Sequence, residues 1–495
     1  MAVPAGIRAL LLHDTALFVG DAASAEIQLR PGADRLLCRL RYSNLLVGIS
    51  TVSIPLSLEQ DALLRSSGSS EFLKPVVLDR DHPGLALEAL LDVWKVPGNA
   101  CIFLAAKIDE GLEKTVEEHN WNIMQLHPGG KEYHLSLRAN PVKDLHHLLS
   151  AIAKLNKKAS GDSVILVGHH MKWSREKDFL KRGAFPLLHT ENGLSFVPMS
   201  PDSALDDQFE SIDVLLTKPT DEIVSWENGL FSHVFHGIKF SESFEKVASY
   251  LREHPSIFVI DPLEHIVPLM DRFATQDLLE SIILKMNTRY QKIRAPQSVK
   301  IEAVDQPNFL EVSDVAKLGF PTIVKPQIAC GASDAHVMAV VLRKEGYRGL
   351  QVPFPAIVQE YIDHGSKIYK FYILGHKLFF SVRRSMPNVA DLSSNSPAIV
   401  FDSLKSLPVN EKHAEQQSFN GEESTSQLDL EAVECLAAAL RTRLGLTIFG
   451  FDIVIQEGTN DHVIVDVNYF PSFKDVPDSE AIPAFWNAII KRSHQ

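Results

Sequence analysis

The most informative stretch of the sequence is Thr447–Asn468, TIFGFDIVIQEGTNDHVIVDVN. Two runs of strand-forming residues flank the turn formers QEGTND, a pattern that predicts a β-hairpin. A turn centred on Thr459 places Asp452 opposite Asp466, with Asn468 on the same face. Facing carboxylates repel each other unless a cation separates them, and oxygen ligands suit Mg²⁺. We therefore predict a metal site at Asp452, Asp466 and Asn468, although a one-residue slip would turn Asp452 to the other face.

A second hairpin is predicted at Lys367–Ser385, where KIYKFYIL and KLFFSVRRS flank the two-residue turn GH. This register sets Lys370 opposite Ser381, with Arg383 on the same face and Arg384 pointing away. A face that gathers positive charge needs an anion, and the guanidinium fork of arginine fits phosphate. The alternative is an exposed basic edge strand that prevents aggregation.

A third element is Phe320–Val341, FPTIVKPQIACGASDAHVMAVV. Lys325 ends one strand, a loop of small residues follows, and His336 begins the next strand. Small residues let backbone N–H groups approach phosphate oxygens, although an ordinary hairpin turn is the preferred interpretation of the loop by itself. The chain contains no GxxxxGK[ST] motif, so a P-loop is excluded.

Bulk properties limit the class of protein. The chain has 495 residues, 45% hydrophobic and 22% charged, which indicates a globular protein of roughly two to four domains. A net charge of −13 argues against a nucleic-acid partner, but a local basic cluster can still bind a small polyanion. No apolar run is long enough to span a bilayer and no secretory signal is evident, so we expect no membrane association. The four cysteines lie far apart and fit no zinc spacing, which favours the cytoplasm or the nucleus.

The order of these elements resembles the ATP-grasp fold: a lysine at a strand end, a small-residue loop, the strand QEYI, a lysine strand, a helix and the Asp…Asp-x-Asn hairpin. Within that fold the motifs DVLLTKPTD, PTIVKP, QEYIDHGSKIYKFYILG and VDVNYFPSF resemble the inositol 1,3,4-trisphosphate 5/6-kinase family, plant branch. The resemblance runs from about Val164 to the C-terminus.

The resemblance implies a role for each matching residue. It implies catalytic roles for His336, Lys370 and Arg383, and metal ligation by Asp452, Asp466 and Asn468. It implies ATP binding by Arg272, Lys325, Gln359, Glu360, Tyr361, Ile362, Lys370 and Ser385. It implies substrate binding by Lys218, His336, Lys370, Arg383, Asn468, Ser472 and Lys474.

The implied activity is an ATP- and Mg²⁺-dependent kinase, with one or two Mg²⁺ ions. Its substrate is expected to be inositol 1,3,4-trisphosphate, phosphorylated at the 5- or 6-hydroxyl, or an inositol tetrakisphosphate, in the route to inositol hexakisphosphate (phytate). We expect a monomer. Two alternatives are an ATP-grasp carboxylate–amine ligase and a non-catalytic inositol-phosphate scaffold. Ser472 replaces a glycine of the family motif NYFPGY, and neither Lys172 nor Lys177 is singled out as the N-terminal substrate lysine, so the preferred isomer stays open.

Residues 1–158 lie outside the core family and alternate strand and helix patterns, which indicates an α/β domain. Asp14-Thr15 and Ser50 at strand ends resemble a haloacid-dehalogenase-like domain, and Ala16 stands where that pattern needs a second aspartate. We therefore expect this domain to be catalytically inactive; a plain Rossmann-like domain is the alternative. The predicted fold class is α/β: this N-terminal domain at 1–158, then an ATP-grasp core. The core divides into an N-terminal α/β part at 163–262, a central part at 263–362 and a C-terminal part with the metal site at 363–495.

Overall fold

The computed structural model describes residues 6–20, 27–126, 140–160, 164–201, 204–226, 237–286, 292–304, 314–332, 334–392, 396–405 and 428–493. The chain forms two compact units. One comprises Met1–Leu216 and Tyr250–Phe258, and the other comprises Thr217–Ser249 and Val259–Gln495. No helix in the described part of the chain combines the length and the apolar character needed to cross a bilayer.

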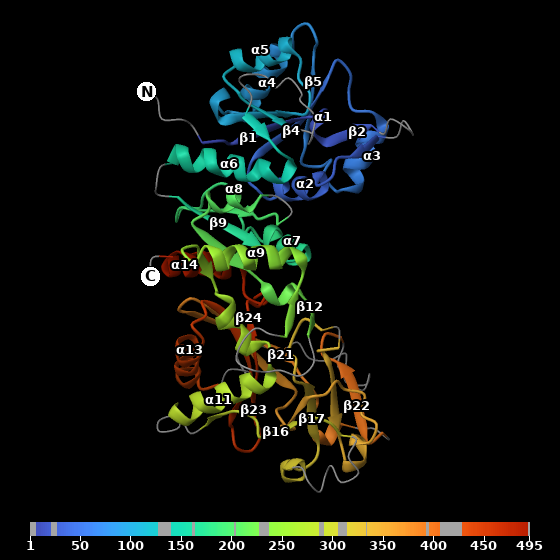
Figure 1. The fold of residues 1–495 in the computed structure, drawn as a ribbon, viewed down its shortest axis with the longest axis vertical. Helices are drawn as coiled ribbons and strands as arrows, with labels where there is room; N and C mark the ends of the chain where they lie inside the picture. Colours follow the sequence, from blue (N-terminus) through green and yellow to red (C-terminus); the bar gives the residue numbers. More distant parts are fainter. Residues whose placement is uncertain are drawn as a thin grey trace. The chain divides into compact units, whose positions relative to one another are not determined.

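The first unit contains a six-stranded sheet in the order β5-β4-β1-β6-β7-β8, in which neighbouring strands are parallel (Figure 1). Its strands are β1 (Ala9–His13), β4 (Leu46–Val52), β5 (Lys74–Leu78), β6 (Cys101–Ala105), β7 (Asn122–Leu126) and β8 (Asn140–Val142). Every residue of β1 is buried, as expected for a parallel sheet covered on both faces. Leu10 and Leu12 join one apolar cluster, and Ala9 and Leu11 join another, which is the two-residue period of a strand.

Helices supply the other half of each cluster. α2 (Ala33–Arg41) and α6 (Leu145–Ser160) contribute to the cluster with Leu10. α4 (Pro83–Trp94) and α5 (Glu110–Glu118) contribute to the cluster with Leu11. The remaining elements of this region are α1 (Asp14–Leu17), the paired strands β2 (Phe18–Gly20) and β3 (Ile27–Leu29), α3 (Leu58–Ser66) and η1 (Gly98–Ala100). The α/β alternation read from residues 1–158 is therefore confirmed.

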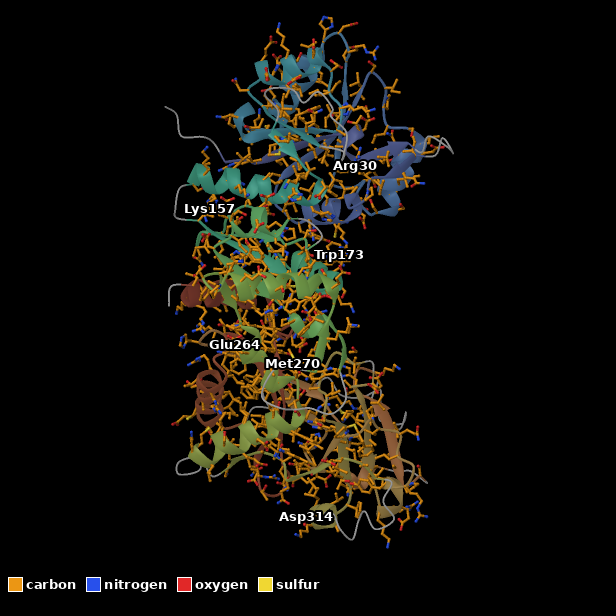
Figure 2. The ribbon with its side chains drawn as sticks, viewed as in Figure 1. Arg30, Lys157, Trp173, Glu264, Met270 and Asp314 are labelled. Atoms are coloured by element: carbon orange, nitrogen blue, oxygen red, sulfur yellow. The ribbon has the colours of Figure 1, made fainter. Side chains whose placement is uncertain are left out.

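A four-stranded sheet in the order β10-β9-β11-β14 comes next along the chain. Its strands are β9 (Ile165–His170), β10 (Leu194–Pro198), β11 (Val214–Thr217) and β14 (Phe258–Ile260), and its helices are α7 (Trp173–Lys181), α8 (Leu205–Phe209) and α9 (Glu242–Glu253). Trp173, labelled in Figure 2, begins α7, and the guanidinium carbons of Arg35 and Arg39 each lie 5.6 Å from its ring centroid. Arg39 also pairs with Glu176 of α7 at 2.7 Å. Helix α2 of the N-terminal sheet is thereby joined to α7.

The second unit is built around two five-stranded sheets, in the orders β15-β24-β23-β20-β21 and β16-β19-β17-β18-β22 (Figure 1). The first consists of β15 (Ile293–Arg294), β20 (Lys367–Leu374), β21 (Lys377–Arg384), β23 (Ile448–Ile455) and β24 (His462–Tyr469). The second consists of β16 (Ser298–Ile301), β17 (Thr322–Pro326), β18 (Val337–Val341), β19 (Ala356–Glu360) and β22 (Ala398–Asp402). Neighbouring strands are antiparallel except β15 and β24.

Three long helices belong to this unit: α11 (Arg272–Met286), α13 (Leu430–Leu444) and α14 (Asp478–Ser493). α11 packs against α13, and α14 packs against β20. The remaining elements are η3 (Pro219–Asp221), β12 (Ile223–Trp226), β13 (Ile238–Phe240), α10 (Leu263–Ile266), η4 (Val267–Leu269), η5 (Asp314–Leu318), η6 (Lys344–Tyr347) and η7 (Val389–Asp391).

The polar segment from Ala390 to Leu428 reads from the sequence as one mobile loop, and this reading is wrong for part of it. β22 lies inside the segment and pairs with β18, so that Val337 is opposite Asp402. The run AIVF supplies the strand-forming side chains that overcome the polar surroundings. Residues 393–395 and 406–427 lie outside the described part of the chain.

Candidate active site

A cavity of about 610 Å³ is lined by residues of both five-stranded sheets. Its size falls in the range of small-molecule sites, roughly 300–1,000 Å³. Thirteen residues predicted for the site line it: Arg272, Lys325, His336, Gln359, Glu360, Tyr361, Ile362, Lys370, Arg383, Ser385, Asp452, Asp466 and Asn468. Lys218, Ser472 and Lys474 are not among its lining residues.

Strand register brings the two acids together. Asp452 of β23 is the partner of Asp466 of β24, as predicted. A symmetric turn about Thr459 does not produce this pairing, because Ile455 is opposite His462 and the register shifts after Asp452. The bulge adds one residue on β24 and restores the facing pair. The predicted pairing is thus confirmed, although the sequence argument missed the bulge that makes it possible.

A lysine stands against the acid pair. Lys370 of β20 is the cross-strand partner of both Ser381 and Asp452. Its Nζ donates to Asp452 Oδ2 at 2.5 Å, and Asn468 Nδ2 donates to Asp466 Oδ2 at 2.9 Å. Burial, together with the charge of Asp466, raises the pKa of Asp452 to about 6 despite the ion pair.

This donor set fits a hard divalent cation. Two carboxylates that face each other and a neighbouring amide provide the oxygen ligands that Mg²⁺ prefers, and such sites complete their coordination with water and substrate phosphates. No cluster of three His, Cys, Asp or Glu side chains suited to a metal occurs among the described residues. A cation at Asp452, Asp466 and Asn468 would therefore complete its coordination with oxygens of water or of a ligand.

Two further cations lie in the interior of the cavity. Lys325 Nζ donates to the carbonyl oxygen of Val465 at 3.0 Å, and burial lowers its pKa to about 8. Arg272 Nη1 donates to the carbonyl oxygens of Pro326 at 2.6 Å and Ile328 at 2.8 Å. Burial also lowers the pKa of Arg272, and the charge of Asp466 opposes that effect. A bound polyanion would offset the desolvation of both cations.

The strand QEYI forms one wall of the cavity, but its side chains have partners in the protein. Glu360 accepts hydrogen bonds from Arg294 Nη1 at 2.5 Å and from the backbone N–H of Gln297 at 2.6 Å. The Tyr361 hydroxyl donates to the carbonyl oxygen of Pro387 at 2.6 Å. This segment can therefore offer a ligand its main chain and the apolar surface of Ile362, as a hinge that holds a flat base would.

The cavity is lined by more cations than the sequence predicted. Arg383 lines it as expected, and so does Arg384, which the alternation of strand side chains had turned away. Arg384 is the last residue of β21 and pairs with Lys367. His336 is half-buried, its Nδ1 lies 3.3 Å from Ser403 Oγ, and burial lowers its pKa. Lys405, which the sequence argument also missed, lines the same cavity from the turn after β22.

Asp475 is a functional candidate that no sequence pattern singled out. It lies in the loop between β24 and α14, and its carboxylate accepts hydrogen bonds from Arg383 and from the Tyr372 hydroxyl at 2.6 Å. The one sequence signal that could have pointed to Asp475 is its position next to Lys474 and close to Ser472 in NYFPSFKD.

Lys218 takes another position. Its Nζ donates to the carbonyl oxygen of Tyr469 and lies 5.0 Å from the centroid of the Tyr469 ring.

The small-residue loop that follows Lys325 packs against β12: Gly331 has φ +82°, and the Cys330 carbonyl accepts from Trp226 Nε1 at 3.0 Å. A Cβ on Gly331 would lie 2.3 Å from Ile223 Cβ, so this glycine is required for the close packing.

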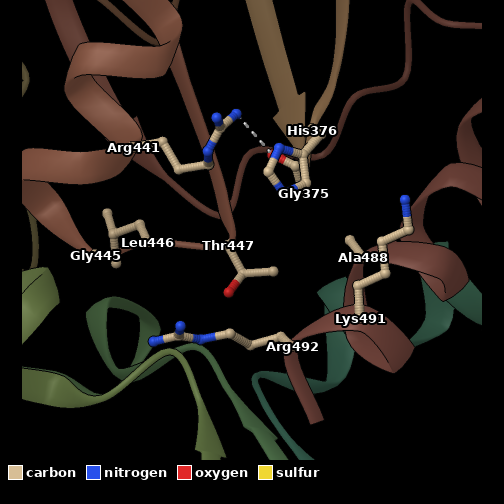
Figure 3. Close-up of a pocket in the computed structure, with 9 residues that line it drawn as sticks. All are labelled: Gly375, His376, Arg441, Gly445, Leu446, Thr447, Ala488, Lys491 and Arg492. Carbon is tan, nitrogen blue, oxygen red and sulfur yellow. Dashed lines mark hydrogen bonds between the residues drawn. The ribbon is translucent and has the colours of Figure 1, made fainter. Parts of the chain in front are cut away.

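A second, smaller cavity of about 160 Å³ lies at the turn between β20 and β21 and is lined by His376, Arg441, Lys491 and Arg492 (Figure 3). Arg441 Nη1 donates to the carbonyl oxygen of Gly375 at 3.4 Å, and Arg492 lies on the other side of Thr447. Arg441, Lys491 and Arg492 occupy the last turns of α13 and α14, where cations stabilise the negative helix ends. Helix stabilisation accounts for this basic cluster without a ligand.

The N-terminal sheet carries the residues Asp14, Thr15 and Ser50. Thr15 N donates to Asp14 Oδ1 at 2.7 Å, and Thr15 Oγ1 accepts from the backbone N–H of Ala106 at 3.3 Å. Ser50 is fully buried, and its hydroxyl has no hydrogen-bond partner among the described residues. Ala16, at the position that would need a second carboxylate, is fully buried.

Comparisons with known proteins agree with this arrangement. Residues 287–488 match the model of the inositol 1,3,4-trisphosphate 5/6-kinase ATP-grasp domain. Residues 1–158 match the model of the ITPK4 N-terminal HAD-like domain, which decides for that alternative over a plain Rossmann-like domain.

Relatives extend over most of the chain. Inositol-tetrakisphosphate 1-kinase 6 of Oryza sativa subsp. indica is 41% identical over 98% of this chain and 88% of its own length. Inositol-tetrakisphosphate 1-kinase of Xenopus laevis is 27% identical over 62% of this chain and 74% of its own length. Among solved structures, D-alanine–D-alanine ligase from Bacillus anthracis aligns with a TM-score of 0.40 and 15% identity, covering 67% of this chain and 97% of that one. An alignment this loose does not bear on function.

Proposed function

Because the chain belongs to the inositol 1,3,4-trisphosphate 5/6-kinase (inositol-tetrakisphosphate 1-kinase) family, we propose that it transfers the γ-phosphoryl group of ATP to a free hydroxyl of an inositol polyphosphate. The substrate we propose is inositol 1,3,4-trisphosphate or an inositol tetrakisphosphate. One observation carries the proposal: the facing pair Asp452 and Asp466 shares a cavity with Lys325, Lys370 and Arg383.

Each part of the cavity supplies one requirement of phosphoryl transfer, which depends on positioning and charge neutralisation. The main chain of Gln359–Ile362 would hold the adenine. Lys325, Lys370 and Arg272 would hold the phosphates, and Asp452, Asp466 and Asn468 would hold Mg²⁺. Mg²⁺, when bound, neutralises charge that develops on the transferred phosphoryl group.

The acceptor would bind beside the cations of this cavity. His336 and Arg383 would contact inositol phosphates, and Arg384 and Lys405, which line the same cavity, would add positive charge. Lys218, Ser472 and Lys474 would need to reach the substrate from outside the lining of this cavity. The cationic wall supports a polyphosphate acceptor over the acyl phosphate and amine of an ATP-grasp ligase.

The proposal is tested with the purified full chain, ATP, MgCl₂ and individual inositol tris- and tetrakisphosphates, with products separated by anion-exchange chromatography. We expect ADP to form in step with a product that carries one more phosphate. ADP release that instead requires a carboxylate and an amine would assign the chain to the ligases. Failure to bind Mg²⁺-nucleotide would make it a scaffold.

We also propose that the HAD-like domain is inactive as a phosphatase, because Ala16 replaces a carboxylate beside Asp14. The full chain should not hydrolyse p-nitrophenyl phosphate, and Asp14→Asn should leave the kinase rate unchanged. Hydrolysis that disappears in Asp14→Asn would overturn this proposal and leave the kinase proposal untouched.

A further inference from the structure

Asp475 contacts the face of the β20–β21 hairpin that carries Ser381 and Arg383. Its Oδ2 accepts from the Tyr372 hydroxyl at 2.6 Å and from Ser381 Oγ at 3.1 Å, while its Oδ1 pairs with Arg383 Nη2. The carboxylate side chain is 22% exposed, whereas that of Arg383 is 51% exposed. The acid is therefore held on three sides within the same face that was predicted to receive an anion.

Three donors fix this carboxylate as an anion. Charge-assisted hydrogen bonds favour the ionised form, and the pKa of Asp475 is lowered although burial alone would raise it. A negative charge is consequently a permanent part of the face that contains Ser381 and Arg383. It occupies one N–H group of Arg383 and offsets much of the guanidinium charge that a phosphate would meet.

A phosphate placed at this end of Arg383 would meet the negative charge of Asp475, whereas a neutral hydroxyl could donate a hydrogen bond to the carboxylate. Like charges brought together at a binding surface reduce affinity and discriminate between partners.

We propose that Asp475 determines substrate specificity by occupying one anion-binding edge of Arg383, so that the enzyme accepts an inositol with a hydroxyl at this position and disfavours one with a phosphate there. Asp475 sets an upper limit on the number of phosphates that the substrate carries. This inference rests on the proposed kinase function and adds to it the chemical class of the preferred acceptor.

The test compares KM and kcat of the wild-type chain, Asp475→Asn, Asp475→Glu and Glu480→Gln for inositol tris-, tetrakis- and pentakisphosphates. Asp475→Asn removes the charge but keeps an oxygen acceptor, and should shift the ratio of kcat/KM values toward the more phosphorylated acceptors on the order of tenfold. Asp475→Glu keeps the charge and should retain the wild-type order. Glu480→Gln removes an exposed charge five residues away and controls for net charge.

A second measurement covers a variant that loses turnover. Calorimetric titration with inositol hexakisphosphate should give tighter binding to Asp475→Asn than to the wild type. Equal loss of kcat/KM for every acceptor, without tighter hexakisphosphate binding, would show that Asp475 only holds Arg383 in place and would overturn the inference. An absence of turnover in the wild-type chain with every inositol phosphate would instead defeat the proposed function.

Discussion

Burial shifts the pKa values of Lys325 and Asp452 in opposite directions, because it disfavours the charged form of each side chain. The pKa of Lys325 falls from 10.5 to about 8, so in the free protein the lysine is charged below about pH 8. The pKa of Asp452 rises from 3.8 to about 6, so the carboxylate is ionised above about pH 6. Both groups have the charge needed to bind a Mg²⁺-nucleotide only between these values.

We expect kcat/KM for ATP to fall on both sides of this window. Below about pH 6, protonation of Asp452 removes a cation ligand, and above about pH 8, deprotonation of Lys325 removes a phosphate partner. A pH series of initial rates measures both limbs. Lys325→Arg keeps its charge at alkaline pH, so the alkaline limb should move upward while the acid limb stays.

An alkaline limb that is the same in Lys325→Arg would show that another group titrates there.

Lys325 also affects the stability of the fold. Between about pH 8 and pH 10.5 the unfolded chain binds more protons at this position, so Lys325 destabilises the fold below about pH 8 and this penalty disappears as the pH rises.

Asp466 gives a second prediction at the residue scale. It faces Asp452, and Asn468 donates to its Oδ2 at 2.9 Å. Asp466→Asn keeps the side-chain volume and removes one negative charge from the pair, so kcat should fall by at least about 100-fold. The melting temperature should change little, because the variant also removes repulsion between two acids. Circular dichroism on heating and an ADP-release assay measure the two effects.

The matched control is Glu434→Gln on α13, an exposed acid distant in sequence from the hairpin that should leave both readouts unchanged. Turnover near the wild-type rate in a clean Asp466→Asn preparation would remove the metal site from the proposed mechanism.

At the scale of elements, local pattern was sufficient for the two hairpins of the site. Lys370 pairs with Ser381 as the two-residue turn requires. Asp452 pairs with Asp466 only because β24 contains a bulge. No residue in VIVDVN predicts that bulge.

The end of α13 is a second element that sequence anticipated, and it yields a prediction. Gly445 ends the helix with φ +68°, and its N–H donates to the Arg441 carbonyl at 2.8 Å. A Cβ there would lie 2.8 Å from ring atoms of His265. Gly445→Ala should therefore destabilise the protein by about 2–3 kcal/mol, the sum of left-handed strain and overpacking.

Gly349→Ala separates these two causes. Gly349 has φ +69°, and a Cβ at this position would meet nothing within 4 Å. Gly349→Ala should lower the unfolding free energy by only about 1 kcal/mol, because it introduces the left-handed backbone strain without the overpacking. Urea denaturation of both variants measures the difference, and equal losses of unfolding free energy would show that the His265 contact relaxes without cost.

At the scale of the whole molecule, the decisive contacts join residues far apart in the chain, which single-sequence patterns do not reveal. Arg383 and Asp475 belong to different motifs, so the acid that neutralises the predicted arginine was missed. The same limit applies to Arg39 and Glu176, which are 137 positions apart. Composition predicted a domain at 1–158 but gave no sign of what holds it to the segment that follows.

Arg39 and Glu176 supply that connection. Arg39 Nε and Nη2 donate to the two oxygens of Glu176 at 2.7 and 3.1 Å, and the side chains are 10% and 6% exposed. His169 Nε2 lies 3.3 Å from Glu176 Oε1. Burial alone would raise the pKa of Glu176, but these partners outweigh it and lower the pKa to about 2. The ionised Glu176 therefore stabilises the fold above about pH 4.5, and this contribution is lost as the pH falls toward 2.

Removal of one partner should lower the unfolding free energy by far more than the intact pair contributes to it. The remaining charge is then buried without an opposite charge beside it. We expect Arg39→Met to lower the unfolding free energy by about 3–5 kcal/mol, and the double variant Arg39→Met/Glu176→Gln to recover much of that loss. Arg41→Met on the same helix is the control, since Arg41 and its partner Glu71 are 39% and 79% exposed and such pairs contribute less than about 1 kcal/mol. Urea denaturation of the four proteins measures the differences. If Arg39→Met unfolds like Arg41→Met, the buried pair does not couple α2 to α7, and the apolar cluster that α2 and α6 share with Leu166 of β9 and Val197 of β10 holds the N-terminal domain in place without it.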